Sequence, residues 1–141
     1  MSSFTEMAVT PLNDGINWKL LKSFTYDVGK LGGSDRIKVP RGFKTDFGSA
    51  PRFLWGIVSP IGKAIGGFVL HDYLYATQER SRLVSDAILL EAMEICNVNW
   101  FQRTLVYRGV RLGGWVSWKA HTKARSAALA AGKSYPELLT V

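Results

Sequence analysis

Residues 68–77 constrain the fold more than any other part of this sequence, because they are apolar on nearly every side. A helix that is hydrophobic all round has no face for water and belongs in the centre of a domain. A short turn at residues 79–81 follows, and residues 82–96 then place Leu83, Asp86, Ala87, Leu90 and Met93 on one stripe at helical spacing. The pattern predicts an antiparallel helical hairpin.

The segments on either side of this hairpin differ in character. Residues 18–28 are rich in aromatic and β-branched side chains, and residues 36–39 alternate polar and apolar, which predicts two or three short antiparallel strands. Ser49 and Pro51 are typical of the start of a short helix. A further helix is expected to begin near Asn99, and Gly113–Gly114 to kink or end it. Its expected inward residues are Trp100, Phe101, Leu105 and Leu112.

These segments predict an α+β fold that is mostly α, with short N-terminal antiparallel strands followed by a three- to four-helix bundle. The length of 141 residues suits a single domain over 1–141. We expect it to be mainly extended over 1–48, with a helical core at 49–115 and a basic helical tail at 116–141. The one cysteine, Cys96, excludes a disulfide framework and a multi-cysteine zinc cluster.

Positive charge is concentrated near the C-terminus. The formal net charge is +7, and residues 101–141 hold seven Lys and Arg against a single Glu. Such a segment either is simply solvated or faces an anionic partner, such as a lipid surface or an acidic protein. No Lys/Arg run or aromatic–basic alternation supports nucleic-acid binding in particular. The sequence has no apolar run long enough for a transmembrane helix and no signal-peptide pattern, so we expect a protein made in a reducing cytoplasm.

Two polar residues lie where the pattern demands apolar ones. His71 interrupts the central apolar helix, and Asp86 lies on the apolar stripe of the next helix. A buried carboxylate is costly unless charge or hydrogen bonds offset the loss of water. The two residues are at similar distances from the turn, so an antiparallel hairpin brings them together and predicts a hydrogen bond between them.

This pairing has two interpretations. A carboxylate on one imidazole nitrogen leaves the other nitrogen as a general base, which points to catalysis by His71 with Asp86 and with Tyr75 one helical turn away. Alternatively, the pair only fastens two helices together. Arg82 is a weaker candidate for pairing with these acids or for binding a substrate phosphate.

Two further carboxylates are candidate metal ligands. Asp72 is rotated away from His71 on the same helix, and Asp46 lies in a loop bounded by Gly and Pro. Together with His71 and Asp86 they form a set suited to Ca²⁺, Mg²⁺, Mn²⁺ or Zn²⁺. The alternative for Asp46 is a capping role at the start of the short helix.

The combined motifs resemble a family of small proteins encoded mainly by tailed phages and prophages and known only as a domain of unknown function. The matching features are V-P-x-G-F-x-T-D-F-x-S-x-P-R from Val39, H-D-x-L-Y from His71, Ser85–Asp86 and E-A-M from Glu91. The resemblance covers about residues 16–115. It implies a phage origin and synthesis in the host cytoplasm, with the phage virion as one location for the protein. It implies no activity.

The arrangement His-Asp-x-x-Tyr with a second Asp on an antiparallel helix is also similar to the catalytic helices of phospholipases A2. That resemblance implies that His71 activates water, Asp72 holds Ca²⁺, Asp86 orients His71 and Tyr75 braces the network. The chain lacks their disulfides, and Gly42–Gly48 is the one segment that could replace their calcium loop.

Two functional hypotheses follow. The first is a metal-assisted hydrolase of an ester or phosphoester. The second is a non-enzymatic phage protein, either a virion or tail component or a protein that binds a host component. There the His–Asp pair is structural, and the basic C-terminal segment with Trp115 and Trp118 makes contact with other virion proteins or an anionic host component.

Overall fold

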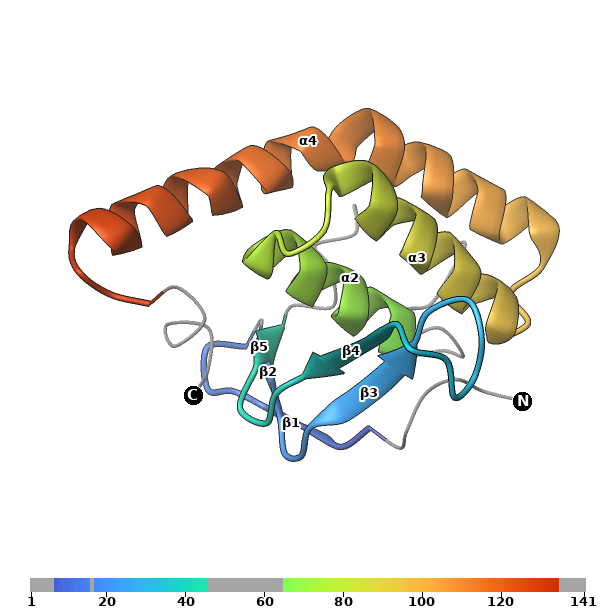
Figure 1. Ribbon diagram of the computed structural model, residues 1–141, viewed down its shortest axis with the longest axis horizontal. Helices are drawn as coiled ribbons and strands as arrows, with labels where there is room; N and C mark the ends of the chain where they lie inside the picture. The colour runs from blue at the N-terminus through green and yellow to red at the C-terminus, as the bar shows by residue number, and fades with distance from the viewer. Residues whose placement is uncertain (1–6, 16, 46–64, 135–141) are drawn as a thin grey trace.

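Five short strands precede three packed helices in the computed structural model of the chain, which describes residues 7–15, 17–45 and 65–134 (Figure 1). The predicted α+β class is therefore confirmed. The elements are β1 (Val9–Pro11), β2 (Trp18–Leu20), β3 (Phe24–Asp27), β4 (Arg36–Val39), β5 (Lys44–Thr45), α2 (Ile65–Thr77), α3 (Arg82–Ile95) and α4 (Trp100–Ala130). The short helix expected after Ser49, and the candidate ligand Asp46, lie outside the described residues.

The strands form two small antiparallel sheets. One has the order β1-β2-β5, and the other is the β3–β4 hairpin, in which Phe24 pairs with Val39 and Asp27 with Arg36. In β4 the residues alternate strictly between exposed and buried, as a strand with one apolar face requires. The predicted extended region thus contains more strands than expected, because residues 18–28 divide into β2 and β3.

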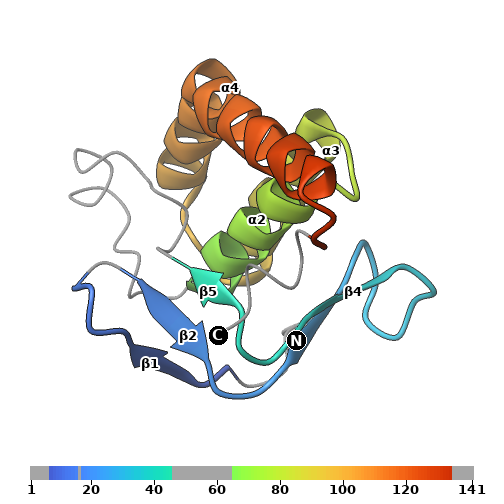
Figure 2. The same cartoon turned by 90° about the vertical axis from the view of Figure 1, so that its left-hand side faces the viewer.

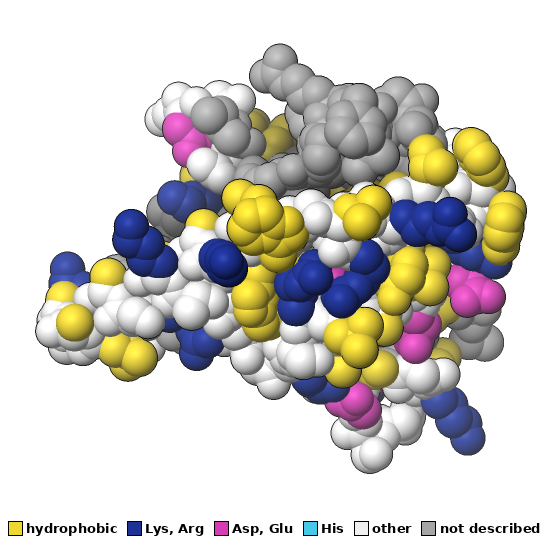
Figure 3. Space-filling view, turned by 90° about the horizontal axis from the view of Figure 1, so that it is seen from above, with side chains coloured by type: hydrophobic (Ala, Val, Ile, Leu, Met, Phe, Trp, Pro, Cys, Tyr) yellow, Lys and Arg dark blue, Asp and Glu magenta, His cyan; other side chains and the backbone are white. Residues whose placement is uncertain are grey.

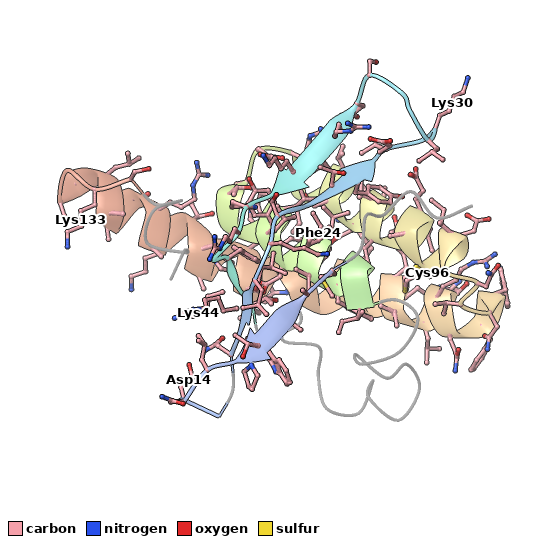
Figure 4. The ribbon with its side chains drawn as sticks, turned by 90° about the horizontal axis from the view of Figure 1, so that it is seen from below. Asp14, Phe24, Lys30, Lys44, Cys96 and Lys133 are labelled. Carbon is pink, nitrogen blue, oxygen red and sulfur yellow. The ribbon has the colours of Figure 1, made fainter. Side chains whose placement is uncertain are left out.

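The elements stack in three tiers. Figures 1 and 2 show the strands on one side, α2 and α3 in the middle, and α4 across the far side of these two helices. In the view from the strand side, Phe24 lies in front of the helices (Figure 4). It belongs to a core cluster shared by the strands, α2 and α3. A second cluster joins α2, α3 and α4 around Leu89, Met93 and Val106. The central position predicted for α2 is confirmed by eight buried residues in its thirteen.

The ends of the last two helices follow from their capping residues. The Ser81 side chain accepts a hydrogen bond from the backbone N–H of Val84 at the start of α3, and Asn99 does the same for Gln102 at the start of α4. Between them, Asn97 takes a positive φ of 59° that ends the α3 segment. These limits agree with those expected from the sequence.

Two expectations about α4 are wrong. The helix continues through Gly113 and Gly114 to Ala130, so the glycine pair does not end it. The expected inward residues Trp100, Phe101 and Leu112 are exposed on its surface. The buried residues of α4 are instead Val106 and Ala128.

The stripe predicted on α3 is only partly right. Asp86 and Met93 are buried, whereas Leu83 and Ala87 are exposed. Because α3 is covered both by α2 and by α4, its buried face is wider than a single stripe and is rotated relative to the prediction. The residues that form it are Ser85, Asp86, Ile88, Leu89, Ala92 and Met93. None of the helices in the described part of the chain is long and apolar enough to cross a membrane.

Glu91 of α3 fastens the β3–β4 hairpin to the helices. Its Oε1 atom accepts a hydrogen bond of 2.6 Å from the Tyr26 hydroxyl and one of 2.8 Å from the backbone N–H of Gly29. Tyr26 is fully buried, and burial followed by the nearby Glu91 carboxylate raises the pKa of its hydroxyl far above the usual value. The hydroxyl therefore remains a donor at every relevant pH.

We expect Glu91→Ala to lower the free energy of unfolding by about 1–3 kcal/mol, because it leaves the buried Tyr26 hydroxyl without its charged acceptor. Urea denaturation at neutral pH measures this change. Glu94→Ala is the matched control on the same helix, since Glu94 is exposed and its nearest ion-pair partner, Arg103, is 3.9 Å away. Equal losses in the two variants would contradict the role of Glu91.

Candidate functional site

A fully buried carboxylate, Asp86, is the centre of the candidate site. The predicted hydrogen bond is confirmed: Nε2 of His71 lies 2.7 Å from Oδ1 of Asp86. The Tyr75 hydroxyl donates to the same oxygen at 2.7 Å, and Nη1 of Arg111 donates to Oδ2 at 2.6 Å. Because His71 and Tyr75 belong to α2 and Arg111 to α4, one carboxylate on α3 joins all three helices.

Cations offset the burial of this carboxylate. Arg82, one helical turn before Asp86, places its Nη1 3.5 Å from Oδ2 and also donates to the backbone carbonyls of Val110 and Arg111. Burial is the largest influence on the pKa of Asp86 and raises it, but the hydrogen bonds from His71, Tyr75 and Arg111 together outweigh it and lower the pKa below the usual value. Asp86 is therefore ionised at neutral pH.

The charge of Asp86 assigns the proton on His71. An ionised carboxylate only accepts hydrogen bonds, so Nε2 of His71 carries the hydrogen in this contact. In a neutral imidazole the lone pair then lies on Nδ1, which is the atom that can accept a proton. Nδ1 makes no hydrogen bond to the residues that the structure describes. The arrangement has the parts that a general base needs.

Tyr75 completes the support of the network. Its ring lies 4.2 Å from that of His71, centroid to centroid, and meets Trp118 of α4 edge-on at 5.1 Å. Burial, then the hydrogen bond to Asp86, raises the pKa of the Tyr75 hydroxyl well above its usual value, so it stays protonated as a donor. Trp118 thus faces inward, contrary to its expected place in a contact surface with Trp115.

Gly114 allows α4 to come this close. A Cβ atom at position 114 would lie 2.5 Å from the Tyr75 hydroxyl oxygen and 3.4 Å from Nη1 of Arg82. Both atoms are tied to Asp86, so neither can move aside without breaking the network. At the neighbouring Gly113 a Cβ atom would meet nothing within 4 Å. The glycine pair expected to interrupt the helix instead contains the position where it touches the site.

Asp72 points toward the strands rather than toward Asp86. Its Oδ2 accepts a hydrogen bond of 2.7 Å from the Thr45 hydroxyl at the end of β5. Asp72 follows His71 directly in α2, and its side chain is half-buried. Across residues 7–15, 17–45 and 65–134, no three or more His, Cys, Asp or Glu side chains gather in a possible metal site. Asp46, the second predicted ligand, is outside these residues.

No sequence pattern marks Arg111 as part of the site, and Arg82 is only a weaker candidate from the sequence. A spacing of four residues before Asp86 on one helix was the available signal for Arg82. Arg111 had no comparable signal, because its contact depends on how α4 is rotated against α3. Only the packed structure shows that the side of α4 carrying Arg111 faces the site, where Arg82 contacts the Val110 carbonyl and Gly114 lies against Tyr75.

Comparison with known proteins supplies the family. The family model described as "Protein of unknown function (DUF1353)" matches residues 18–110, which include β2 to β5, α2, α3 and the first third of α4. The chain therefore belongs to the DUF1353 family. No match was found among curated proteins or among solved structures.

We expect Gly114→Ala and Gly113→Ala to change stability in opposite directions. The methyl group at position 114 collides with Tyr75 and costs about 1–3 kcal/mol of unfolding free energy through overpacking. The same change at position 113 adds a better helix former in open space and gains about 0.5–1 kcal/mol. Thermal denaturation of both variants measures the difference. A stabilised Gly114→Ala variant would show that the close contact between α4 and Tyr75 does not exist.

We expect Asp86→Asn to remove stability in a pH-dependent way. The folded-state pKa of Asp86 is lowered, so its contribution is complete above the unfolded-state value of about 4 and is lost as the pH falls through the folded-state value. At pH 7 the variant takes the charged acceptor away from His71, Tyr75 and Arg111, and its free energy of unfolding is lower than that of the wild type by about 3–5 kcal/mol. Urea unfolding should show this gap narrowing below about pH 4.

Asp35→Asn is the control for that experiment, because it removes a carboxylate from an exposed ion pair with Arg80. Its effect on stability at pH 7 should be far smaller. A gap between wild type and Asp86→Asn that stays constant down to pH 3 would contradict an ionised Asp86.

Proposed function

We propose that the protein is a metal-assisted hydrolase of an ester or phosphoester, with His71 as its general base. The observation that carries the proposal is the contact between Nε2 of His71 and the ionised Asp86, because it leaves the lone pair of Nδ1 to take a proton from water. Asp86 and Tyr75 are positioning residues in this scheme. They hold the ring and its tautomer and do not touch the substrate.

The neighbouring carboxylate supports a cation at this site. Asp72 and Thr45 offer a carboxylate and a hydroxyl oxygen, which are ligand types that Ca²⁺ and Mg²⁺ prefer, whereas Zn²⁺ favours nitrogen and sulfur. A bound cation would polarise the carbonyl or phosphoryl oxygen of the substrate. The similarity of His71, Asp72, Tyr75 and Asp86 to the catalytic helices of phospholipases A2 favours Ca²⁺ and a phospholipid ester.

This chain would then act as follows. Asp72 would hold a cation, and His71 would accept the proton of an attacking water at Nδ1 while Nε2 remains bonded to Asp86. The positive charge that develops on the imidazole is stabilised by that carboxylate. His71 then returns the proton to the leaving oxygen, which restores the neutral ring.

The second candidate function is non-enzymatic, and the Asp86 contacts with Arg111 and Arg82 favour it. A carboxylate that only orients a catalytic histidine does not require two guanidinium groups at its other oxygen. A carboxylate that holds three helices together does, because Arg82 and Arg111 connect it to α3 and α4. In this alternative the protein is a phage virion or tail component, or a protein that binds a host component. Its presence as a stoichiometric band in purified phage particles would support this function.

We expect calorimetric titration to detect Ca²⁺ or Mg²⁺ binding to the wild type and its loss in Asp72→Asn, with Asp35→Asn as the control that keeps binding. Hydrolysis of phospholipid and phosphodiester substrates should fall by about 100-fold or more in His71→Asn. The proposal fails if none of Ca²⁺, Mg²⁺, Mn²⁺ and Zn²⁺ binds to the wild type and if the wild type hydrolyses these substrates no faster than His71→Asn.

A further inference from the structure

The side of α4 that faces away from α2 and α3 carries a continuous row of apolar and basic side chains. We call this row the outer stripe; its members are Phe101, Arg108, Leu112, Trp115, Val116, Lys119 and Lys123. Each lies three, four or seven residues from another member, which places them on one face of a helix. Figure 3, seen from the α4 side, shows hydrophobic and basic side chains interleaved along this surface.

The apolar members of the outer stripe are unusually exposed. Leu112 is 80% exposed, Phe101 63% and Val116 58%. A single exposed apolar residue is ordinary, but several in one row on a rigid helix mark a contact surface. Nothing in the described part of the chain covers them, because α4 packs on the rest of the molecule through its other face.

The charges of α4 are divided in the same way. The helix holds six Lys and Arg residues and not one Asp or Glu in 31 residues. On the inner side, Arg111 pairs with Asp86, Arg103 lies 3.9 Å from Glu94, and Arg125 donates to Gln78.

The outer cations differ from the inner ones. Arg108, Lys119 and Lys123 form no ion pair with an acidic side chain among the described residues. Lys119 lies instead 5.0 Å from the centre of the Trp115 ring. The outer stripe therefore presents unneutralised positive charge beside exposed apolar surface.

We propose that the outer stripe docks on an anionic lipid surface. A second copy of this chain would bring like charges together along the full helix, and a nucleic acid would leave the aliphatic members Leu112 and Val116 in water. A helix lying in a lipid interface satisfies both halves of the pattern, since apolar side chains enter the acyl boundary while Lys and Arg extend to anionic headgroups. This inference does not depend on the proposed hydrolase activity.

The test is co-sedimentation of the full chain with vesicles of ether-linked phosphatidylcholine, with and without an equal part of ether-linked phosphatidylglycerol. Ether lipids have no acyl ester to hydrolyse, so binding is measured apart from any turnover. We expect binding to the phosphatidylglycerol vesicles, weak binding to the neutral ones, and a decrease as salt is added.

Two double variants divide the contributions. Lys119→Glu with Lys123→Glu should weaken binding by about 25-fold or more, since each basic residue near an anionic surface is worth about fivefold. Leu112→Ser with Val116→Ser keeps every charge and should weaken binding by about tenfold or more through lost apolar contact. All four residues are exposed, so the fold does not depend on them.

The control has the same change of charge elsewhere. Lys30→Glu with Lys38→Glu places two acidic residues on the β3–β4 hairpin, where Lys30 projects from the loop on the strand side (Figure 4). This variant should bind the vesicles nearly as well as the wild type. An equal loss in the control and in the Lys119/Lys123 variant would overturn the proposal in favour of net charge alone.

Two other results would also overturn it. The first is failure of the wild type to bind phosphatidylglycerol vesicles at low salt. The second is tighter binding of a short single-stranded or duplex oligonucleotide at the same salt, lost in the Lys119/Lys123 variant but kept in the Leu112/Val116 variant. That pattern would assign the outer stripe to a nucleic acid.

Discussion

The helical half of this protein depends on one buried negative charge. Asp86 is removed from water, and its hydrogen-bond and ion-pair partners among the described residues are all donors or cations: His71 and Tyr75 from α2, Arg82 from its own helix and Arg111 from α4. Such a group is unfavourable until every partner is in place. The network therefore selects one arrangement of three helices over other arrangements that bury the same apolar area, and Gly114 allows the closest of these contacts.

The sequence predicted those parts of the site that depend on neighbouring elements. The His71–Asp86 contact follows from a short turn and two polar residues in apolar surroundings, and it is present. The face of α4 was predicted wrongly because large apolar residues usually point inward, and here Trp100, Phe101 and Leu112 do not. Helix rotation in this protein is decided by small residues and by Arg111, whose partner is 25 positions earlier in the chain. Local patterns carry no information about such a distant contact.

The same helix meets two different environments. On the inner side of α4 the cations contact carboxylates, an amide and a backbone carbonyl, whereas those on the outer side form no ion pair with an acidic side chain among the described residues. Asp72 is hydrogen-bonded to Thr45 on the strand side of α2, whereas His71 is bonded to Asp86, which Arg111 reaches from the inner face of α4. A surface contact through the outer stripe and chemistry at His71 would thus use opposite faces of the same helix, since Arg111 on the inner face of α4 belongs to the His71–Asp86 network.

The tier order also decides when each part of the chain can fold. The strands come first in sequence, but their apolar residues are buried against α2 and α3, and an isolated two-stranded hairpin is at best marginally stable in water. Glu91, which fastens the hairpin, follows Tyr26 by 65 positions. During synthesis this contact can form only after α3 has left the ribosome, and the contact between Asp86 and Arg111 only after the first part of α4 has followed. Native structure in this chain is completed from its C-terminal side.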